Sequence, residues 1–262
     1  MVRGKLKLVS KIENRKRFNL FSTSNFHTIF KFLTTIFQFI LDLIFPKYCF
    51  GCNKESSWLC EECLTNILPV ETQTCPNCKK ITQTGRYCSK CRKKASLSGV
   101  IVAAYYEEGP VKELIHNFKY NHILEVENIL GDLMTQALRN NFPAKKDLLI
   151  TCVPLHFLRQ ARRGYNQSEI LANYIAGKLK ISKNFKILKK IRKTRPQVQF
   201  SGKKRRENLK NSFKICKNAD VLGKTFVVVD DVTTTGATLN ECARILKVAG
   251  ARRVWGLVIA KG

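Results

Sequence analysis

Acidic residues are scarce in this chain of 262 residues, which has 19 Asp and Glu against 47 Lys and Arg. The formal net charge of +28 excludes an acidic solvating protein and points to a polyanionic partner: a phosphorylated metabolite, a nucleic acid or an anionic membrane. Prolines are few as well, at seven, and 25% of residues are charged, which excludes a collagen-like or mostly disordered chain. The apolar fraction of 44% is sufficient for the core of one or two domains.

Long apolar runs are missing from the segment between Thr28 and Phe45, where no run of apolar residues exceeds three. Polar residues recur there at three- and four-residue steps and would form one stripe of a helix: Lys31, Thr34, Thr35, Gln38 and Asp42. A membrane-spanning helix needs about 20 predominantly apolar residues. We therefore predict an amphipathic helix over residues 26–46 that packs on the following domain, behind a basic flexible tail over residues 1–25. A membrane-surface or signal-anchor helix and an organelle-targeting sequence are the alternatives.

Eight of the eleven cysteines form four Cys-x-x-Cys pairs: Cys49/Cys52, Cys60/Cys63, Cys75/Cys78 and Cys88/Cys91. Each such turn points two thiolates at one centre, and two turns complete a tetrahedral zinc shell without an open position. We therefore predict two structural Zn²⁺ ions. Neighbouring turns share an ion in the simplest pairing, and a crossed pairing is the alternative.

Disulfides are the competing interpretation of these cysteines. The sequence shows no convincing cleavable signal, and we expect a cytoplasmic protein, so zinc is favoured. A ribbon of this size buries little apolar surface, and metal binding should therefore supply its folding energy.

After the last cysteine pair the sequence alternates between strand and helix patterns. Strands are expected over residues 100–106, 148–153, 226–229 and 254–260, with helices beginning near residues 110, 166 and 237. Strands separated by helices predict a parallel α/β sheet with helices on both faces. In such folds ligands lie beyond the carboxyl ends of the strands.

The segment FVVVDDVTTTGATL, residues 226–239, contains a buried strand, two carboxylates, a hydroxyl-rich turn with a glycine and the start of a helix. Such a turn and helix N-terminus offer N–H groups, hydroxyls and a positive dipole end to a phosphate. Asp230 and Asp231 would repel that phosphate unless they bind sugar hydroxyls or hydrated Mg²⁺. Helix capping is the alternative, but it accounts for one of these residues rather than two acids and four threonines.

This segment resembles the phosphoribosyl-pyrophosphate (PRPP) motif of type I phosphoribosyltransferases. From about Phe45 onward the chain resembles the ComF family, whose members join a cysteine-rich zinc ribbon to such a domain. The supporting pieces are Leu43-Ile44-Phe45-Pro46, Lys119-Tyr120, Val153-Pro154 with Arg159, Arg163-Gly164-Tyr165-Asn166-Gln167, and Arg206-x-Asn208 with Phe213. The resemblance implies a double zinc ribbon over residues 47–95. It also implies a type I phosphoribosyltransferase-like parallel sheet, flanked by helices, over residues 96–262.

The resemblance also implies roles for individual residues. Asp230 and Asp231 would act as catalytic residues that hold the ribose hydroxyls of PRPP, while Mg²⁺ bridges pyrophosphate and ribose oxygens. The residues expected to bind the 5-phosphate are Thr233, Thr234, Thr235, Gly236, Ala237 and Thr238. Pyrophosphate would bind after Val153-Pro154, with Arg159 and Arg163 as cations, and a solvated arginine cluster is the alternative. For Asn166 and Gln167 the competing interpretation is helix capping.

Residues 186–217 contain thirteen Lys or Arg and one acid, Glu207. We expect a mobile hairpin or lid there, in which Lys203, Arg205 and Arg206 neutralise departing pyrophosphate. Nucleic-acid contact by the same residues is the alternative, and a solubilising surface is the third interpretation.

These features lead to three functional hypotheses. The first, implied by the resemblance, is Mg²⁺-dependent phosphoribosyl transfer from PRPP to an acceptor that the sequence does not identify, linked to DNA uptake in natural competence and to DNA-uptake proteins. The second is a non-catalytic accessory or scaffold that retains the fold and binds single-stranded DNA. A membrane-peripheral assembly factor is a third alternative.

Overall fold

The computed structural model describes residues 36, 43–55, 57–107, 109–121, 123–142, 147–193 and 208–262. The chain divides into two compact units, Met1–Lys47 and Tyr48–Gly262. The tail predicted for residues 1–25 and most of the helix predicted for residues 26–46 lie outside the described residues. Within the described part, no helix is both long and apolar enough to cross a bilayer.

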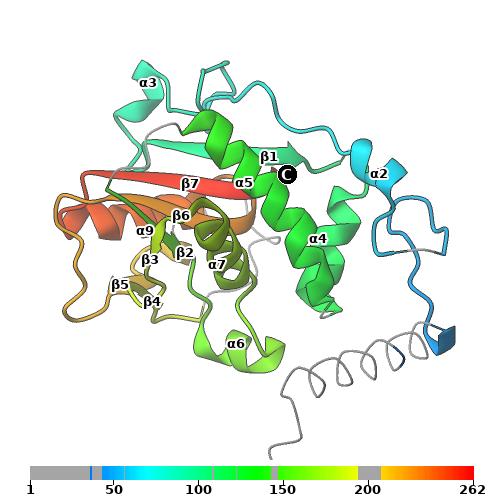
Figure 1. Ribbon diagram of the computed structural model, residues 1–262. Helices are drawn as coiled ribbons and strands as arrows, with labels where there is room; N and C mark the ends of the chain where they lie inside the picture. The colour runs from blue at the N-terminus through cyan, green and yellow to red at the C-terminus, as the bar shows by residue number, and fades with distance from the viewer. Residues whose placement is uncertain are drawn as a thin grey trace, which may run out of the picture. The chain divides into compact units, whose positions relative to one another are not determined.

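A parallel five-stranded sheet forms the centre of the second unit, in the order β1-β7-β6-β2-β3 (Figure 1). Its strands are β1 (Gly99–Tyr105), β2 (Leu148–Cys152), β3 (Ser182–Lys183), β6 (Thr225–Thr233) and β7 (Arg253–Lys261). The uninterrupted apolar run of β6 is typical of a central parallel strand that is covered on both faces. The predicted α/β class is therefore confirmed.

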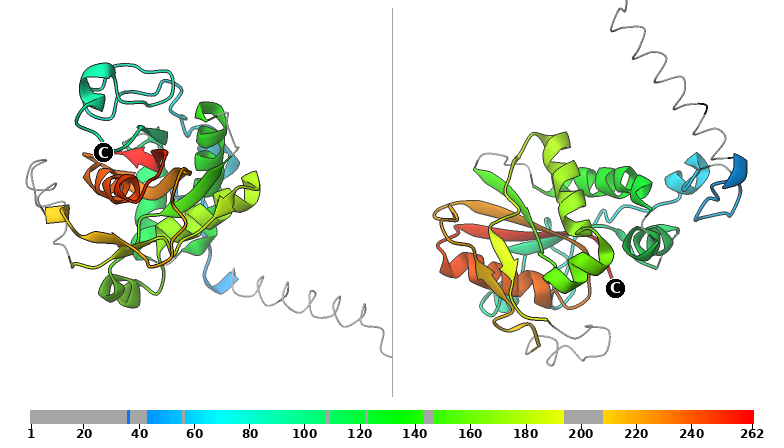
Figure 2. Two further views of the ribbon diagram at one scale, coloured as in Figure 1. Left: turned by 90° about the vertical axis from the view of Figure 1, so that its left-hand side faces the viewer. Right: turned by 90° about the horizontal axis from the view of Figure 1, so that it is seen from below.

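Helices cover both faces of this sheet (Figure 2). Val227 and Val229 of β6 share an apolar cluster with α4 (Val111–Tyr120), α5 (Glu127–Asn141) and α7 (Gln167–Leu179). Phe226 and Val228 share the opposite cluster with α9 (Ala237–Val248). Alternate strand residues point to opposite faces, so a continuous apolar run can serve both helical layers. Two shorter elements of this part of the chain are α6 (Phe157–Arg163) and the 3₁₀ turn η1 (Leu124–Val126).

The central strand is longer than its sequence pattern predicts. We expected it to end at Val229, but β6 continues through both aspartates to Thr233. The extension is possible because β7 stays paired with β6 as far as the Thr233–Lys261 partners. On its other side, β2 pairs with β6 only as far as Cys152 and Val229. The two aspartates therefore lie on a part of β6 that is hydrogen-bonded to a strand on one side only.

The ends of the predicted basic hairpin or lid pair as two short antiparallel strands, β4 (Leu188–Lys190) and β5 (Phe213–Ile215). Residues 194–207, which include Lys203, Arg205 and Arg206, lie outside the described residues.

The cysteine-rich segment has two short helices, α2 (Glu61–Thr65) and α3 (Ser89–Arg92). Its second half is joined to β1 by backbone bridges, Pro69 with Ala104 and Arg86 with Gly99. The buried side chain of Gln73 adds two hydrogen bonds to β1: its Nε2 donates to the carbonyl of Val102 at 2.9 Å, and its Oε1 accepts from the same residue's N–H at 3.0 Å. Residues from Tyr48 onward consequently form one compact unit in which the cysteine-rich segment is an integral part.

Candidate functional site

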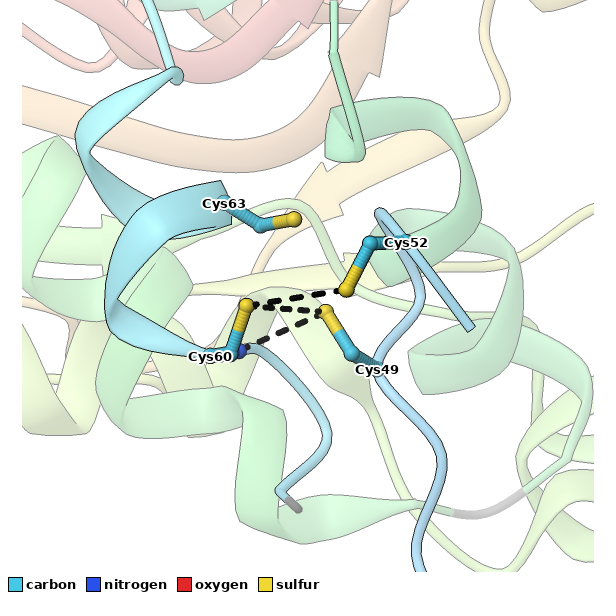
Figure 3. A group of neighbouring side chains, drawn as sticks. All are labelled: Cys49, Cys52, Cys60 and Cys63. Atoms are coloured by element: carbon cyan, nitrogen blue, oxygen red, sulfur yellow. Dashed lines mark hydrogen bonds between the residues drawn. The ribbon is translucent and has the colours of Figure 1, made fainter. Parts of the chain in front are cut away.

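The eight paired cysteines form two separate groups, Cys49/Cys52/Cys60/Cys63 and Cys75/Cys78/Cys88/Cys91. In each group the four Sγ atoms lie within 4.8 Å of one another. Figure 3 shows the first group, with its four side chains directed toward a common centre. Two of its Sγ–Sγ distances are 3.6 Å and 3.7 Å, close to the roughly 3.8 Å that four tetrahedral Zn–S bonds of about 2.3 Å require. The residues fit Zn²⁺, and neighbouring turns share each site as predicted.

The thiolate form that zinc requires is favoured at Cys49 in the first group and at Cys75 and Cys88 in the second, where hydrogen bonds lower the pKa. Burial raises the pKa of Cys49, but backbone N–H groups, among them that of Cys60 at 3.4 Å from its Sγ, outweigh burial and bring the pKa to about 6. Cys75 has the same balance of burial against backbone N–H groups, and its pKa also falls to about 6. Both groups supply four sulfur ligands, so they suit a structural rather than a catalytic ion.

The two aspartates at the end of β6 have different surroundings. Asp231 is buried, and its Oδ1 accepts from Lys119 Nζ at 3.0 Å and from the N–H of Val232 at 2.6 Å. Its Oδ2 accepts from Gln167 Nε2 at 2.9 Å. Burial alone would raise the pKa of Asp231, but Lys119 and Gln167 outweigh it and hold the pKa below its ordinary value.

Asp230 is only half-buried, and its Oδ1 accepts from Ser168 Oγ and from the N–H of Asp231, both at 3.0 Å. Desolvation is the largest effect on its carboxyl group, and the adjacent charge of Asp231 adds to it. Together they raise the pKa of Asp230 to about 7. The described partners of both acids lie in α4, α7 and β6, so capping of α9 does not account for them.

The turn after β6 is closed by a hydrogen bond and leads directly into α9. Thr233 Oγ1 accepts from the N–H of Gly236 at 3.1 Å, and Gly236 has a φ of 69°, a left-handed value that glycine adopts without strain. Gly236 also occupies the N-cap position of α9 and offers no side chain to cap the first turn. Ala237 begins the helix, Thr234 and Thr235 are exposed, and Thr238 is half-buried.

The arginines expected to bind pyrophosphate lie on α6, which follows β2. Arg159 is exposed, while Arg163 is half-buried with its guanidinium 5.3 Å from the ring centre of Tyr120. Among the described residues, no hydrogen bond or ion pair joins either arginine to the aspartates. A further cation, Lys190, is buried against the ring of Phe213 at 5.4 Å. Burial lowers the pKa of Lys190, and the positive charge of Arg159 lowers it further.

The sequence did not show which contacts the residues around the acidic pair make. Asn166 does cap α7, since its Oδ1 accepts from the N–H of Ser168 at 3.2 Å, which confirms the capping interpretation for this residue. The adjacent Gln167 and Ser168 instead reach the aspartates. Lys119 drew notice only through the family resemblance, and no pattern in a single sequence indicates that its helix lies against β6.

The second cysteine group adjoins the turn after β6. A Cβ atom placed on Gly236 would lie 4.0 Å from the hydroxyl of Tyr87, which directly precedes Cys88. On the same side, Lys261 Nζ donates to the carbonyl of Pro76 at 3.0 Å. Residues of the ribbon and of the turn line one small hollow, among them Thr74, Pro76, Thr233, Gly236 and Lys261.

Comparison with known families agrees with this division of the chain. Residues 40–92 match the double zinc ribbon domain, and residues 119–261 match the phosphoribosyl transferase domain.

Relatives that match most of this chain are known from several bacteria. Competence protein F of Haemophilus influenzae is 31% identical over 222 residues, which cover 77% of this chain and 96% of the relative. The DNA utilization protein YhgH of Salmonella typhimurium is 30% identical over 225 residues, or 82% of this chain and 98% of the relative. Competence protein ComFC of Streptococcus pneumoniae is 25% identical over 207 residues, or 77% and 87%. With a zinc ribbon and a phosphoribosyltransferase domain in this order, and with these relatives matched over nearly their whole length, the chain belongs to the ComF family.

Proposed function

We propose that this protein binds PRPP with Mg²⁺ at the carboxyl end of β6 and transfers the phosphoribosyl group to an acceptor. We further propose that it does so in the cytoplasm, in a role linked to DNA uptake during natural competence. The observation that supports the proposal best is the convergence of an acidic pair, a hydroxyl-rich turn and a helix N-terminus at one end of one strand. This convergence lies within the part of the chain that matches the phosphoribosyl transferase domain.

In this proposal the acidic pair of Asp230 and Asp231 receives the ribose. The 5-phosphate binds over the N-terminus of α9, where N–H groups, hydroxyls and the helix dipole favour an anion. The residues that would bind it are Thr233, Thr234, Thr235, Gly236, Ala237 and Thr238. The left-handed φ of Gly236 supports this assignment, because it lets the chain turn from the strand directly into the helix.

Pyrophosphate would lie beside α6, where Arg159 and Arg163 supply positive charge and Lys190 supplies more. Mg²⁺ prefers oxygen ligands, and the half-buried carboxylate of Asp230 is a suitable one. When bound, the ion neutralises part of the charge on pyrophosphate.

The reaction breaks the bond between the anomeric carbon and a pyrophosphate oxygen, forms a bond from that carbon to the acceptor, and releases the acceptor's proton. Positive charge develops on the ribose and negative charge on the leaving group. Carboxylates near the ribose and cations near pyrophosphate stabilise both. The remaining boundaries follow the same proposal, with a double zinc ribbon over residues 47–95 and the transferase domain over residues 96–262.

Binding of PRPP is tested by calorimetry on the zinc-loaded, full-length protein with MgCl₂ present. We expect saturable binding that is lost in Asp230→Asn, accompanied by pyrophosphate release once an acceptor is supplied. A wild-type protein that is folded and zinc-loaded but produces no binding heat with PRPP would contradict the proposal.

A non-catalytic accessory that binds single-stranded DNA is the second candidate, favoured by the thirteen basic residues of segment 186–217 and by relatives named for competence and DNA utilization. PRPP binding without pyrophosphate release against any acceptor, together with DNA binding that requires Lys203, Arg205 and Arg206, would favour it over the enzyme. DNA binding that persists when these three residues become alanine would count against it.

A further inference from the structure

The two acids of the pair differ in which of their carboxylate oxygens already have donors. Both oxygens of Asp231 are occupied, Oδ1 by Lys119 and the N–H of Val232, and Oδ2 by Gln167. On Asp230, both donors reach Oδ1. No donor among the described residues reaches Oδ2 of Asp230, and the residue is half-buried rather than buried.

Burial makes the partners of Asp231 essential to it. The Asp231 side chain is 8% exposed and the Lys119 side chain 20%. A buried charge without a partner is strongly unfavourable, so each of these two residues requires the other. Gln167 is buried as well, and its Oε1 has no hydrogen-bond partner. The amide is thus oriented for its single bond to Asp231, even though this leaves an acceptor unsatisfied.

The fixed acid also orients its neighbour. The N–H of Asp231 donates to Oδ1 of Asp230, and Ser168 Oγ donates to the same oxygen. These two bonds turn the other oxygen of Asp230 away from its protein partners. One of these donors lies on α7 and the other on β6 itself, while Lys119 of α4 and Gln167 of α7 hold the adjacent Asp231.

We propose that the two aspartates have different roles. Asp231 is a positioning residue that is held in place by Lys119 and Gln167. Of the two, only Asp230 offers a free carboxylate oxygen to a hydroxyl of the ribose. This inference rests on the proposed binding of PRPP. It assigns Lys119 and Gln167 to the site as positioning residues, and it makes the two adjacent aspartates functionally unequal.

The ion pair between Lys119 and Asp231 is tested with four variants of the full-length, zinc-loaded protein: Lys119→Met, Asp231→Asn, the double variant Lys119→Met/Asp231→Asn, and the conservative Lys119→Arg. Each is measured by thermal unfolding and by PRPP titration in the presence of MgCl₂. Lys112→Met, at an exposed lysine on the same helix, is the matched control and should behave as the wild type.

Each single neutralisation should lower Tm by about 5–10 °C, because it leaves one buried charge without its partner. Each should also weaken PRPP binding at least tenfold. The double variant should regain most of the Tm and bind PRPP at least fivefold more tightly than Asp231→Asn. Lys119→Arg should bind PRPP within about threefold of the wild type, a rescue that loss of packing alone would not produce.

Two outcomes would overturn the inference. In the first, the double variant folds with a restored Tm but binds PRPP as weakly as Asp231→Asn, which would mean that Asp231 touches the ribose itself. In the second, the Tm losses of the two single variants simply add in the double variant, which would mean that Lys119 and Asp231 are not coupled. The Tm measurements need no ligand, so they test the coupling of Lys119 and Asp231 even if the wild type does not bind PRPP and the proposed function fails.

Discussion

At the scale of single residues, the acidic pair consists of a buried and a half-buried carboxyl group, and among the described residues its ion-pair partner is Lys119. Asp231 takes that cation, and the pKa of Asp230 is raised to about 7 by burial and by the charge of its neighbour. Pairs of titratable groups whose pKa values are driven apart are common at functional sites, although ion-pair networks produce them too. Here the difference between the two pKa values has a direct geometric cause, because Lys119 contacts Asp231 and not Asp230.

The raised pKa of Asp230 predicts a pH dependence of stability. An unfolded aspartate has a pKa of about 3.9, so between about pH 4 and pH 7 the folded protein holds a proton on Asp230 that the unfolded chain has released. The free energy of unfolding should therefore fall as the pH rises through this range and level off above it. Asp230→Asn cannot titrate, so its stability relative to the wild type should increase by about 1 kcal/mol or more from pH 5 to pH 8. Urea denaturation at several pH values measures this difference, and a constant difference across the range would contradict the assignment.

A second prediction at this scale concerns Gly236. Its φ of 69° is unfavourable for any residue with a Cβ, while the nearest atom to an added Cβ is 4.0 Å away, so Gly236→Ala changes backbone preference without a clash. We expect a loss of about 1 kcal/mol in stability and a larger relative loss in PRPP affinity, at least tenfold, because the turn shapes the phosphate loop. Gly177→Ala is the control: Gly177 lies within α7 with open space around its Cβ position, and alanine there should stabilise by about 0.5–1 kcal/mol. Unfolding curves and PRPP titrations distinguish the two, and equal PRPP affinity in both variants would contradict the role of Gly236.

At the scale of elements, the sequence predicts what depends on local pattern. The apolar run Phe226–Val229 predicts a central strand because only a strand that is covered on both faces needs apolar residues at every position. The four Cys-x-x-Cys turns predict two closed sulfur sites, and the structure adds the pairing that spacing alone left open. The acidic pair and the hydroxyl-rich turn stand out by their residue pattern, and the family resemblance adds the prediction that they bind the ribose and the 5-phosphate of PRPP.

The remaining features depend on contacts between elements that are distant in the sequence. The ion pair between Lys119 and Asp231 spans more than one hundred residues, and periodicity shows that a helix is buried without identifying its neighbour. The continuation of β6 through the aspartates depends on β7, which pairs with it beyond the end of β2. For Gln167 the sequence left a site role and helix capping open, and only the packing of α7 against β6 reveals its contact with Asp231.

The position of the second zinc ribbon predicts unequal effects of the two metal sites. The first site packs into the apolar cluster shared with α4, whereas Tyr87 and Pro76 of the second ribbon lie beside the phosphate turn and the end of β7. Cys52→Ser and Cys78→Ser should each reduce bound zinc from two ions to one. Cys52→Ser should cause the larger fall in Tm, and Cys78→Ser the larger loss of PRPP affinity relative to its change in Tm. Zinc content by elemental analysis, thermal unfolding and PRPP titration test this, and identical profiles for the two variants would contradict the coupling of the second ribbon to the turn.

At the scale of the whole molecule, the net charge of +28 far exceeds what one PRPP molecule needs for its neutralisation. Segment 186–217 carries thirteen of the basic residues, and its ends pair as β4, which includes Lys190, and β5. An excess of this size favours a second, larger polyanion, such as the single-stranded DNA of the second candidate function.

This excess predicts DNA binding with a strong dependence on salt. Each phosphate contact that releases a counterion contributes about 0.7 to the slope of log affinity against log salt for a single strand. Replacing Lys203, Arg205 and Arg206 together by alanine should therefore reduce the slope by up to about 2 and weaken binding at about 0.1 M salt. The triple variant of Lys54, Lys112 and Lys180, which are exposed and lie outside the basic segment, removes the same charge and should change the slope less. Fluorescence anisotropy with a labelled oligonucleotide over a range of salt concentrations provides both slopes. If the two triple variants lose affinity and slope equally, DNA responds to net charge alone, and the basic segment is a solubilising surface rather than a binding site.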